Sequence, residues 1–290
     1  MSWRTVVIEK RCKLDYKMGY MVVRDSETKR VFLDEIAILL IENPAVSLTG
    51  CLIEALAEKK VRVIFCDSRR SPLTELVPYH GSHNSADRIR MQIRWKDETK
   101  ALIWQKIIRE KIRLQAAHLG DLKKQREYDL LCSYIDQVEP PDATNREGHA
   151  AKVYFNALFG MDFTRGADRP ENAALNYGYS VILSAFNREI ALNGYLTQLG
   201  IFHDNQFNHF NLSSDLMEPF RILIDRKVVA MQPRKLEREE KHALWKILGD
   251  TVVIDQSKQV VLNAIKVYCG HVFDALNSGD VSGISFYERL

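Results

Sequence analysis

The stretch SRRSPLTELVPYHGSHNS, residues 68–85, separates two parts of the sequence with different periodicities. Its Pro, Gly, Ser and Asn residues are typical of a linker. Short runs rich in β-branched and aromatic residues precede it, and long amphipathic patterns follow it. We therefore predict an α+β protein with a small β-rich N-terminal domain, residues 1–77, and a larger α-helical domain, residues 78–290.

The first part favours strands at 3–9, 19–25, 29–42 and 61–67, with one helix near 52–59. In the second part Ala101, Trp104, Ile108 and Ile112 form an apolar stripe at helical spacing. Lys106, Arg109, Lys111 and Arg113 are expected mostly off this stripe. Further helices are expected near 145–159, 173–199, 216–230, 236–248 and 258–276.

The composition is that of an ordinary globular protein, with 46% hydrophobic and 27% charged residues. The longest apolar run, Ile36 to Ile41, is too short to span a bilayer, and the N-terminus has no secretory signal. We therefore expect a cytoplasmic protein without a membrane partner. The five cysteines are scattered without a CxxC motif, which supports neither a disulfide framework nor a zinc site.

Charge is distributed unevenly, although the net charge is only +3. Residues 88–126 hold twelve Lys or Arg against four acidic residues. Such an excess attracts phosphate backbones. The alternative is a helix face exposed to solvent.

Glu147 has two interpretations. With Thr144 it forms the T-x-x-E pattern of a capping box, and Gly160 is placed to end the helix. However, Glu147 also shares a helix face with Ala151, Tyr154 and Leu158, which should pack inward. A carboxylate on a buried face needs a hydrogen bond, a charged partner or a metal.

Asp215 and Glu218 present a similar choice. They form another potential capping box, and Glu218 can pair with Arg221 three residues later. Pro219 removes a backbone N–H, which indicates unusual local geometry. His203 follows Gly200, which is expected to end the long helix beginning near Asn172.

Two carboxylates and an imidazole, from Glu147, Glu218 and His203, would suit Mg²⁺ or Mn²⁺. A loop histidine and two helix caps remain the alternative interpretation of the same residues. Spacing alone leaves metal-dependent phosphodiester chemistry as a hypothesis.

The sequence resembles CRISPR-associated protein one, the integrase of spacer acquisition, and looks most like its type II form. The resemblance covers essentially the whole chain. Its most specific stretches are NREGHAAKVYFNALFG (145–160), ENAALNYGYSVILSAFNREI (171–190), LTQLGIFHDNQFN (196–208) and FNLSSDLMEPFR (210–221).

The resemblance implies that Glu147, His203 and Glu218 are metal ligands and catalytic residues, with Asp215 in a supporting role. The implied reaction is transesterification. The 3′-hydroxyl of a short DNA fragment (a prespacer) attacks a phosphodiester at the end of a CRISPR repeat. Metal-dependent endonuclease activity on branched DNA is the same chemistry with water or in reverse.

Double-stranded DNA, as prespacer and as CRISPR repeat and leader, is the implied partner. Candidate contacts are Arg146, Arg165, Arg169, Tyr177 and Arg221, although aromatic packing in a helix is an equal alternative for Tyr177. The resemblance further implies a homodimer joined through the β-rich domain and a complex with a dimer of the small CRISPR-associated protein two. In type II systems it also implies the effector nuclease and an accessory DNA-clamp protein.

Two other functions fit parts of the sequence. His203-Asp204 is an HD dipeptide, as in metal-dependent phosphohydrolases of nucleotides, but His149 and Asp225 fit the remaining ligand positions poorly. Alternatively, the protein is a non-catalytic helical scaffold that binds DNA.

Overall fold

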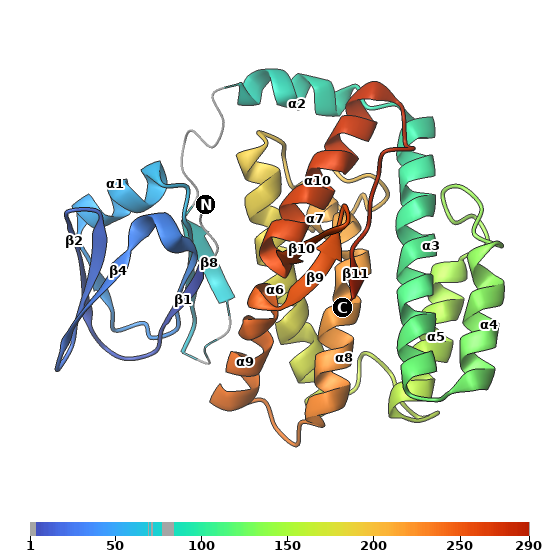
Figure 1. Cartoon of the computed structure of the whole chain (residues 1–290), viewed down its shortest axis with the longest axis horizontal. Helices are drawn as coiled ribbons and strands as arrows, with labels where there is room; N and C mark the ends of the chain where they lie inside the picture. The colour runs from blue at the N-terminus through green and yellow to red at the C-terminus, as the bar shows by residue number, and fades with distance from the viewer. Residues whose placement is uncertain (1–3, 69, 71, 77–83, 290) are drawn as a thin grey trace. The chain divides into compact units, whose positions relative to one another are not determined.

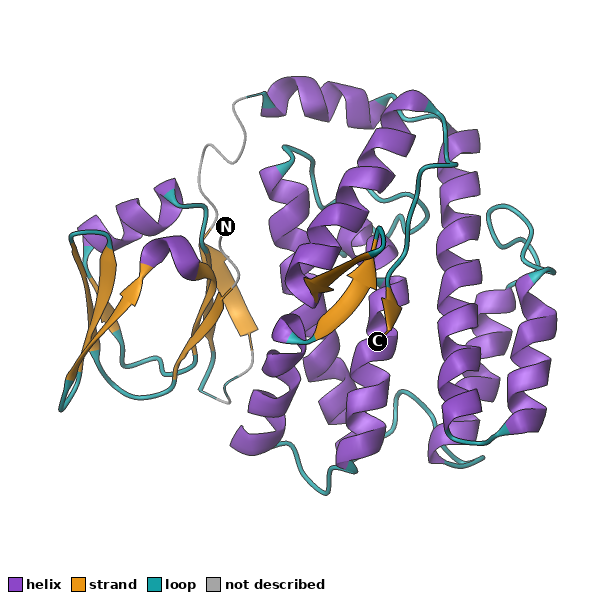
Figure 2. Ribbon diagram, in the orientation of Figure 1, coloured by secondary structure: helices purple, strands orange, loops and turns teal. Residues whose placement is uncertain are grey.

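The computed structural model describes residues 4–68, 70, 72–76 and 84–289. The chain divides into two compact units, Met1–Ser85 and Ala86–Leu290. The first unit is rich in strands and the second is mainly helical, so the predicted α+β class is confirmed (Figures 1 and 2). The expected boundary between residues 77 and 78 lies outside the described residues.

The N-terminal unit contains two four-stranded sheets. One has the order β1 (Arg4–Ile8), β5 (Ile36–Ile41), β7 (Arg62–Cys66) and β8 (Pro72–Leu76). The other has the order β4 (Thr28–Phe32), β3 (Tyr20–Arg24), β2 (Lys13–Lys17) and β6 (Ser47–Leu48). A 3-10 turn (Leu33–Glu35) precedes β5, and helix α1 (Gly50–Glu58) lies between β6 and β7.

Strand β5 forms the centre of its sheet because it pairs in parallel with β1 and β7. All six of its residues, IAILLI, are buried. A strand buried on both faces needs such a continuous apolar run. The predicted linker is corrected here, because residues 72–76 form β8, antiparallel to β7. Pro72 is tolerated because it is the first residue of an edge strand.

Helix α3 (Asp97–Asp121) runs through the helical unit and packs against α4 (Gln125–Ile135), α5 (Arg146–Phe159), α8 (Arg221–Met231) and α10 (Val261–Ser278). Figure 1 shows α4 and α5 beside it. Helix α2 (Ser85–Ile93) precedes α3. Helix α6 (Pro170–Leu192) packs against α7 (Asn211–Leu216), α8, α9 (Arg238–Trp245) and α10.

Four predicted helices have different bounds in the structure, and the one expected near 236–248 is α9 followed by a 3-10 turn (Lys246–Gly249). Helix α6 ends at Leu192, followed by Gly194 at φ 81°, and does not extend to Gly200. The segment around Pro219 divides into α7, a 3-10 turn (Glu218–Phe220) and α8. Residues Ser257–Val260 form strand β10 because they pair with β9 (Thr251–Ile254), which also pairs with β11 (Glu288–Arg289).

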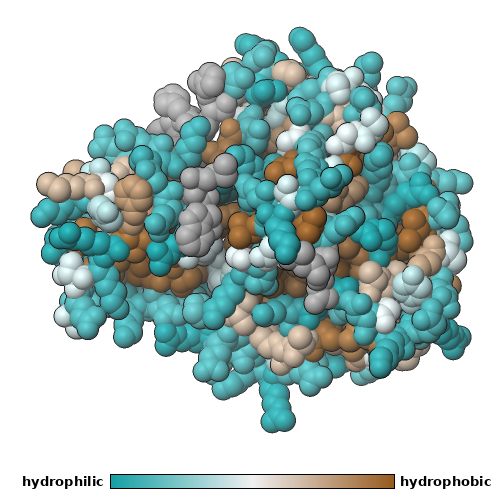
Figure 3. All heavy atoms as spheres, viewed as in Figure 1, coloured by the Kyte–Doolittle hydropathy of each residue, from teal (hydrophilic) through white to brown (hydrophobic). Residues whose placement is uncertain are grey.

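Hydrophilic residues cover most of the surface visible in Figure 3, with smaller hydrophobic areas between them. Among the described residues, no helix combines the length and hydrophobicity needed to span a membrane.

Candidate active site

Glu147 lies in the first turn of α5 with its side chain free for a tertiary contact. Asn145 caps the helix by accepting the N–H of Gly148 at 3.3 Å, and Asp142 accepts the N–H of Glu147 at 3.0 Å. The predicted Thr144–Glu147 capping box is therefore wrong, since other side chains satisfy these N–H groups. The C-terminus is as predicted, with Gly160 ending the helix.

Glu218 lies in the 3-10 turn and is 3% exposed. Its Oε1 pairs with Arg221 Nη1 at 2.7 Å, as predicted, and its Oε2 lies 2.5 Å from Lys111 Nζ. Burial opposes the charge on Glu218, but the two cations outweigh it and lower its pKa well below the ordinary value. Glu218 is therefore ionised whenever the protein is folded near neutral pH.

Lys111 joins the two carboxylates, because its Nζ also lies 2.6 Å from Glu147 Oε1. It projects from the middle of α3 and is 6% exposed. This role of Lys111 was not predicted, because the residue was expected mostly off the apolar stripe, in the basic region 88–126. The available signal was the spacing of Trp104, Ile108, Lys111 and Gln115, at i, i+4, i+7 and i+11 on one helix face.

Asp215 is fully buried and organises the loop that carries His203. Its carboxylate accepts the backbone N–H groups of Ile201 (2.6 Å), Phe202 (3.0 Å) and His203 (3.1 Å). Asp215 lies within α7 rather than at its start, so the predicted capping box with Glu218 is wrong. Gly200 does not end a helix, since α6 ends at Leu192. It lies in the His203 loop, where an added Cβ would lie 2.7 Å from Asp215 Oδ2.

His203 Nδ1 lies 2.5 Å from Asp215 Oδ1. The hydrogen bond to Asp215 raises the pKa of His203 against the effect of burial, and the charges of Glu218 and Glu147 add to the rise. A carboxylate that accepts Nδ1–H fixes the tautomer and leaves the Nε2 lone pair available. This is how proteins commonly orient a metal-binding histidine.

The residues present fit a divalent cation by their chemistry. Among the described residues no group of three His, Cys, Asp or Glu side chains is placed to hold a metal ion, and the Lys111 ammonium contacts both Glu147 and Glu218. Glu218 Oε2 is buried, and the Lys111 ammonium at 2.5 Å is the positive charge that faces it. The carboxylates of Glu147 and Glu218, which flank the Lys111 ammonium, and the oriented imidazole of His203 are ligands of the kind that Mg²⁺ or Mn²⁺ accepts.

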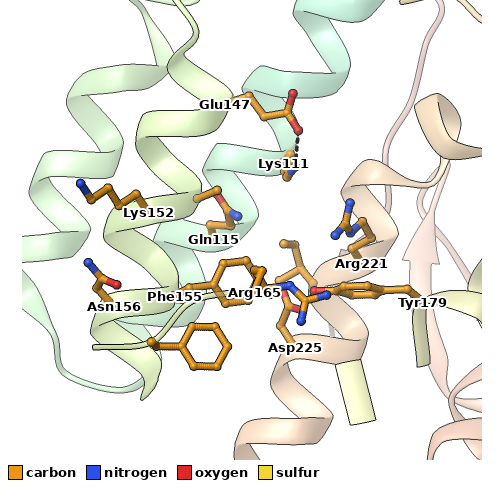
Figure 4. Close-up of a pocket in the computed structure, with 13 residues that line it drawn as sticks. Lys111, Gln115, Glu147, Lys152, Phe155, Asn156, Arg165, Tyr179, Arg221 and Asp225 are labelled. Carbon is orange, nitrogen blue, oxygen red and sulfur yellow. Dashed lines mark hydrogen bonds and ion pairs between the residues drawn. The ribbon is translucent and has the colours of Figure 1, made fainter. Parts of the chain in front are cut away.

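A cavity of about 290 Å³ adjoins this cluster and is shown in Figure 4. Lys111, Glu147 and Arg221 line it together with Asp225. Asp225 is buried and accepts a hydrogen bond from the Tyr179 hydroxyl. Burial raises the pKa of Asp225 to about 6.

The candidate DNA contacts differ in whether they line the cavity next to Glu147. Arg221 lies 4.1 Å from the centre of the Tyr179 ring, and Arg165 lines the same cavity. Arg146 packs on Tyr134 and Arg169 pairs with Glu171, both outside the cavity lining.

Tyr177 needs a correction, because its ring is 5% exposed and its hydroxyl accepts the indole N–H of Trp245 at 2.8 Å. The packing interpretation of Tyr177 is therefore correct, and its ring has little surface to offer a base.

The HD interpretation finds no support in this geometry. His203 bonds to Asp215, whereas Asp204 and His149 are exposed. Asp225 bonds to Tyr179. An HD site would require the side chains of His149, His203, Asp204 and Asp225 to converge on one metal centre.

The family model described as CRISPR associated protein Cas1 matches residues 5–246. The CRISPR-associated endonuclease Cas1 of Neisseria meningitidis serogroup C is 35% identical over 230 residues, which is 79% of this chain and 76% of that protein. This chain belongs to the Cas1 family. Glu147, His203 and Glu218 all lie within the matched residues of this Cas1 chain, whereas strand β11 lies beyond them.

Solved structures show the same fold. A casposase bound to integration product gives a TM-score of 0.75 at 18% identity, covering 97% of this Cas1 chain and 92% of that chain. A Cas6-RT-Cas1–Cas2 complex gives a TM-score of 0.73 at 17% identity, covering 99% of this chain and 36% of the longer one.

Proposed function

We propose that this Cas1 protein is a metal-dependent DNA endonuclease and integrase of CRISPR adaptation. It joins the 3′-hydroxyl ends of short foreign DNA to the ends of a CRISPR repeat by transesterification. The observation that carries the proposal is that Glu147 and Glu218 both contact the buried Lys111 ammonium, and that Asp215 orients the imidazole of His203, whose pKa the two glutamates also raise. Membership of the Cas1 family connects this cluster with DNA chemistry.

Glu147, His203 and Glu218 would hold Mg²⁺ or Mn²⁺. The bound cation would supply Lewis-acid stabilisation of charge at the reacting phosphate. Asp215 would keep the His203 ring in its ligand orientation. Arg221 would hold Glu218 ionised and place a positive charge at the cavity that adjoins the cluster. No covalent protein intermediate is needed.

The proposed partners are double-stranded DNA, a second copy of the chain and a Cas2 dimer. The structural relatives include a casposase bound to an integration product and a Cas1–Cas2 complex, which supports DNA and Cas2 as partners. Arg165 and Arg221 line the cavity next to Glu147 and are the better placed of the predicted DNA contacts. Phosphate contacts of this kind make binding strongly dependent on salt.

The test is strand transfer of a short duplex into a supercoiled plasmid carrying the repeat, with the Cas2 partner and Mg²⁺ or Mn²⁺. We expect His203→Ala to lower the rate by more than about 100-fold, since even residues that only orient a metal ligand cost about 10–100-fold. EDTA should stop the wild-type reaction. The matched control is His209→Ala, an exposed histidine in the same loop, which should join DNA at the wild-type rate.

Equal joining by His203→Ala and wild type would contradict the proposed site. Hydrolysis of free nucleotides without DNA would support the HD alternative. DNA binding that survives EDTA, without strand transfer by the wild type, would support the non-catalytic scaffold.

A further inference from the structure

Lys111 occupies the space between Glu147 and Glu218 where the proposed cation would bind. Its Nζ lies 2.6 Å from Glu147 Oε1 and 2.5 Å from Glu218 Oε2. Mg²⁺ binds carboxylate oxygens at about 2.0–2.1 Å, so it would compete with the ammonium for the same oxygen atoms. Two positive charges this close repel each other strongly in a buried site. Metal binding therefore requires the ammonium of Lys111 to move away.

A second position for the ammonium lies one turn further along α3. Gln115 is 1% exposed, and its side-chain oxygen is buried without a hydrogen-bond partner. An unpaired buried acceptor is rare and destabilising, so this oxygen needs a donor in some state of the protein. Residues four apart share one face of a helix, and an ammonium has three N–H groups to donate. Gln115 is therefore placed to receive Lys111.

The cavity in Figure 4 gives the lysine side chain room for this movement. Lys111 and Gln115 both line it, and its volume is about 290 Å³. Asp225 lines it as well, and burial raises the pKa of Asp225 to about 6. Near neutral pH its carboxylate is therefore ionised and attracts an ammonium. The second position supplies a neutral acceptor and a nearby negative charge.

We propose that Lys111 alternates between these two positions. In the metal-free protein its ammonium holds Glu147 and Glu218 together, and when a divalent cation binds it moves into the cavity and donates to Gln115. Arg221 stays on Glu218 Oε1, at 2.7 Å, so the movement frees only the oxygens that Lys111 contacted. Lys111 is a positioning residue, because it keeps two like-charged ligands in place before the cation arrives. The inference rests on the proposed function, because it takes both glutamates as metal ligands.

The first test uses the wild-type protein, so it requires no variant to fold. Brief treatment with acetic anhydride, with and without Mn²⁺, labels accessible lysines, and mass spectrometry of the peptides gives the rate at each position. We expect Mn²⁺ to raise the acetylation rate of Lys111 about tenfold, as the cavity position goes from about a tenth of the molecules to nearly all. Lys152, exposed on α5 and lining the same cavity, is the internal control and should change by less than about twofold.

The second test is the affinity for Mn²⁺, measured by isothermal titration without DNA. Lys111→Met removes the competing charge and should bind Mn²⁺ about tenfold more tightly than wild type. Gln115→Leu removes the acceptor of the second position and should bind Mn²⁺ about fivefold more weakly, as expected for one hydrogen bond. The double variant should bind like Lys111→Met, because no ammonium remains to be received. The matched control, Lys152→Met, should keep the wild-type affinity.

An acetylation rate of Lys111 that does not change with Mn²⁺ would overturn the inference. Binding of Mn²⁺ by Lys111→Met that is no tighter than that of wild type would do the same, and so would an equal loss from Gln115→Leu with and without Lys111. Any of these results together with metal-dependent strand transfer would overturn the movement of Lys111 alone. A response of Lys111 to Mn²⁺ without strand transfer would overturn the proposed enzymatic function and leave the two positions of Lys111 in place.

Discussion

Strand β5 and helix α3 each run through the centre of their unit, but they bury different chemistry. All six residues of β5 are apolar, and the surrounding core of the N-terminal unit consists of hydrophobic side chains. Helix α3 instead buries Lys111 and Gln115 among its apolar residues. Burying apolar surface stabilises a fold directly, whereas a buried charge must be paired to be tolerated. The helical unit therefore has buried polar groups at its centre whose burial needs charged or hydrogen-bonding partners.

Lys111→Met should have the largest effect on stability among variants that test this contrast. Removing the ammonium leaves the carboxylates of Glu147 and Glu218 without the cation between them, which should destabilise the metal-free protein by about 4 kcal/mol. Mn²⁺ should recover much of this loss, because it would replace the missing positive charge. Thermal unfolding with and without Mn²⁺ measures both effects. Equal losses in the two conditions would show that this cluster is no cation site.

Leu39→Ala should cost about 3 kcal/mol through loss of buried surface and the cavity left behind. Because Leu39 lies in β5 of the N-terminal unit, Mn²⁺ should recover none of this loss. Urea unfolding of the variant with and without Mn²⁺ is the measurement. Leu73→Ala, at a position that is 71% exposed, serves as the control and should change stability by less than about 0.5 kcal/mol. If Mn²⁺ restored the free energy of unfolding of Leu39→Ala, the proposed difference between β5 and α3 would be wrong.

Asp225→Asn tests a buried acid outside the proposed ligand set. Burial raises the pKa of Asp225 from 3.8 to about 6, so the folded state favours the protonated carboxyl. Its contribution to stability is complete below pH 3.8 and is lost as the pH rises through 6. The raised pKa corresponds to about 3 kcal/mol of folding stability that the wild type loses at higher pH. In Asp225→Asn the hydrogen bond from Tyr179 is weaker, which offsets about 1 kcal/mol of the advantage of the variant.

The amide introduced by Asp225→Asn stays neutral at every pH. The free energy of unfolding of the variant, relative to that of wild type, should therefore rise by about 2 kcal/mol between about pH 4 and pH 7. Unfolding free energies of both proteins across this range provide the measurement. A stability difference that does not change with pH would mean that Asp225 titrates at its ordinary pKa.

Tyr287→Phe should have the smallest effect. The Tyr287 hydroxyl donates to the carbonyl of Pro219 at 3.1 Å, and its ring packs on Phe220. Losing only the hydroxyl should cost about 1 kcal/mol. Because Pro219 follows Glu218 directly, the affinity for Mn²⁺ should also fall, which isothermal titration would detect. The control is Tyr16→Phe, on an exposed tyrosine of β2, which should change neither the free energy of unfolding nor the affinity for Mn²⁺. If Tyr287→Phe also changed neither quantity, the contact with Pro219 would have no role in stability or metal binding.

Sequence periodicity predicted the division into a strand-rich and a helical part, because the alternation in strands and the 3.6-residue repeat in helices are local patterns. It also predicted a strand over 29–42, which the structure divides into β4, a 3-10 turn and the apolar strand β5. The resemblance to a known family selected Glu147, His203 and Glu218, which local patterns alone would have left as two helix caps and a loop histidine. Strand β10 forms in place of a helix start because it pairs with the neighbouring strand β9 across the two-residue turn Asp255–Gln256.

The composition of the candidate site depended on contacts between residues far apart in the chain. Lys111 and Glu147 are 36 residues apart, and Tyr287 reaches Pro219 across 68 residues. No local pattern identifies both members of such a pair: the spacing of Lys111 from Trp104 and Ile108 indicates a lysine on an apolar helix face, but it does not indicate which distant carboxylate the lysine bonds. The sequence by itself determined the elements and the residue types available for chemistry. The packing of α3 against α5 and the Glu218 turn decided which of them share one buried space, because Lys111, Gln115 and Glu218 become buried where these elements meet.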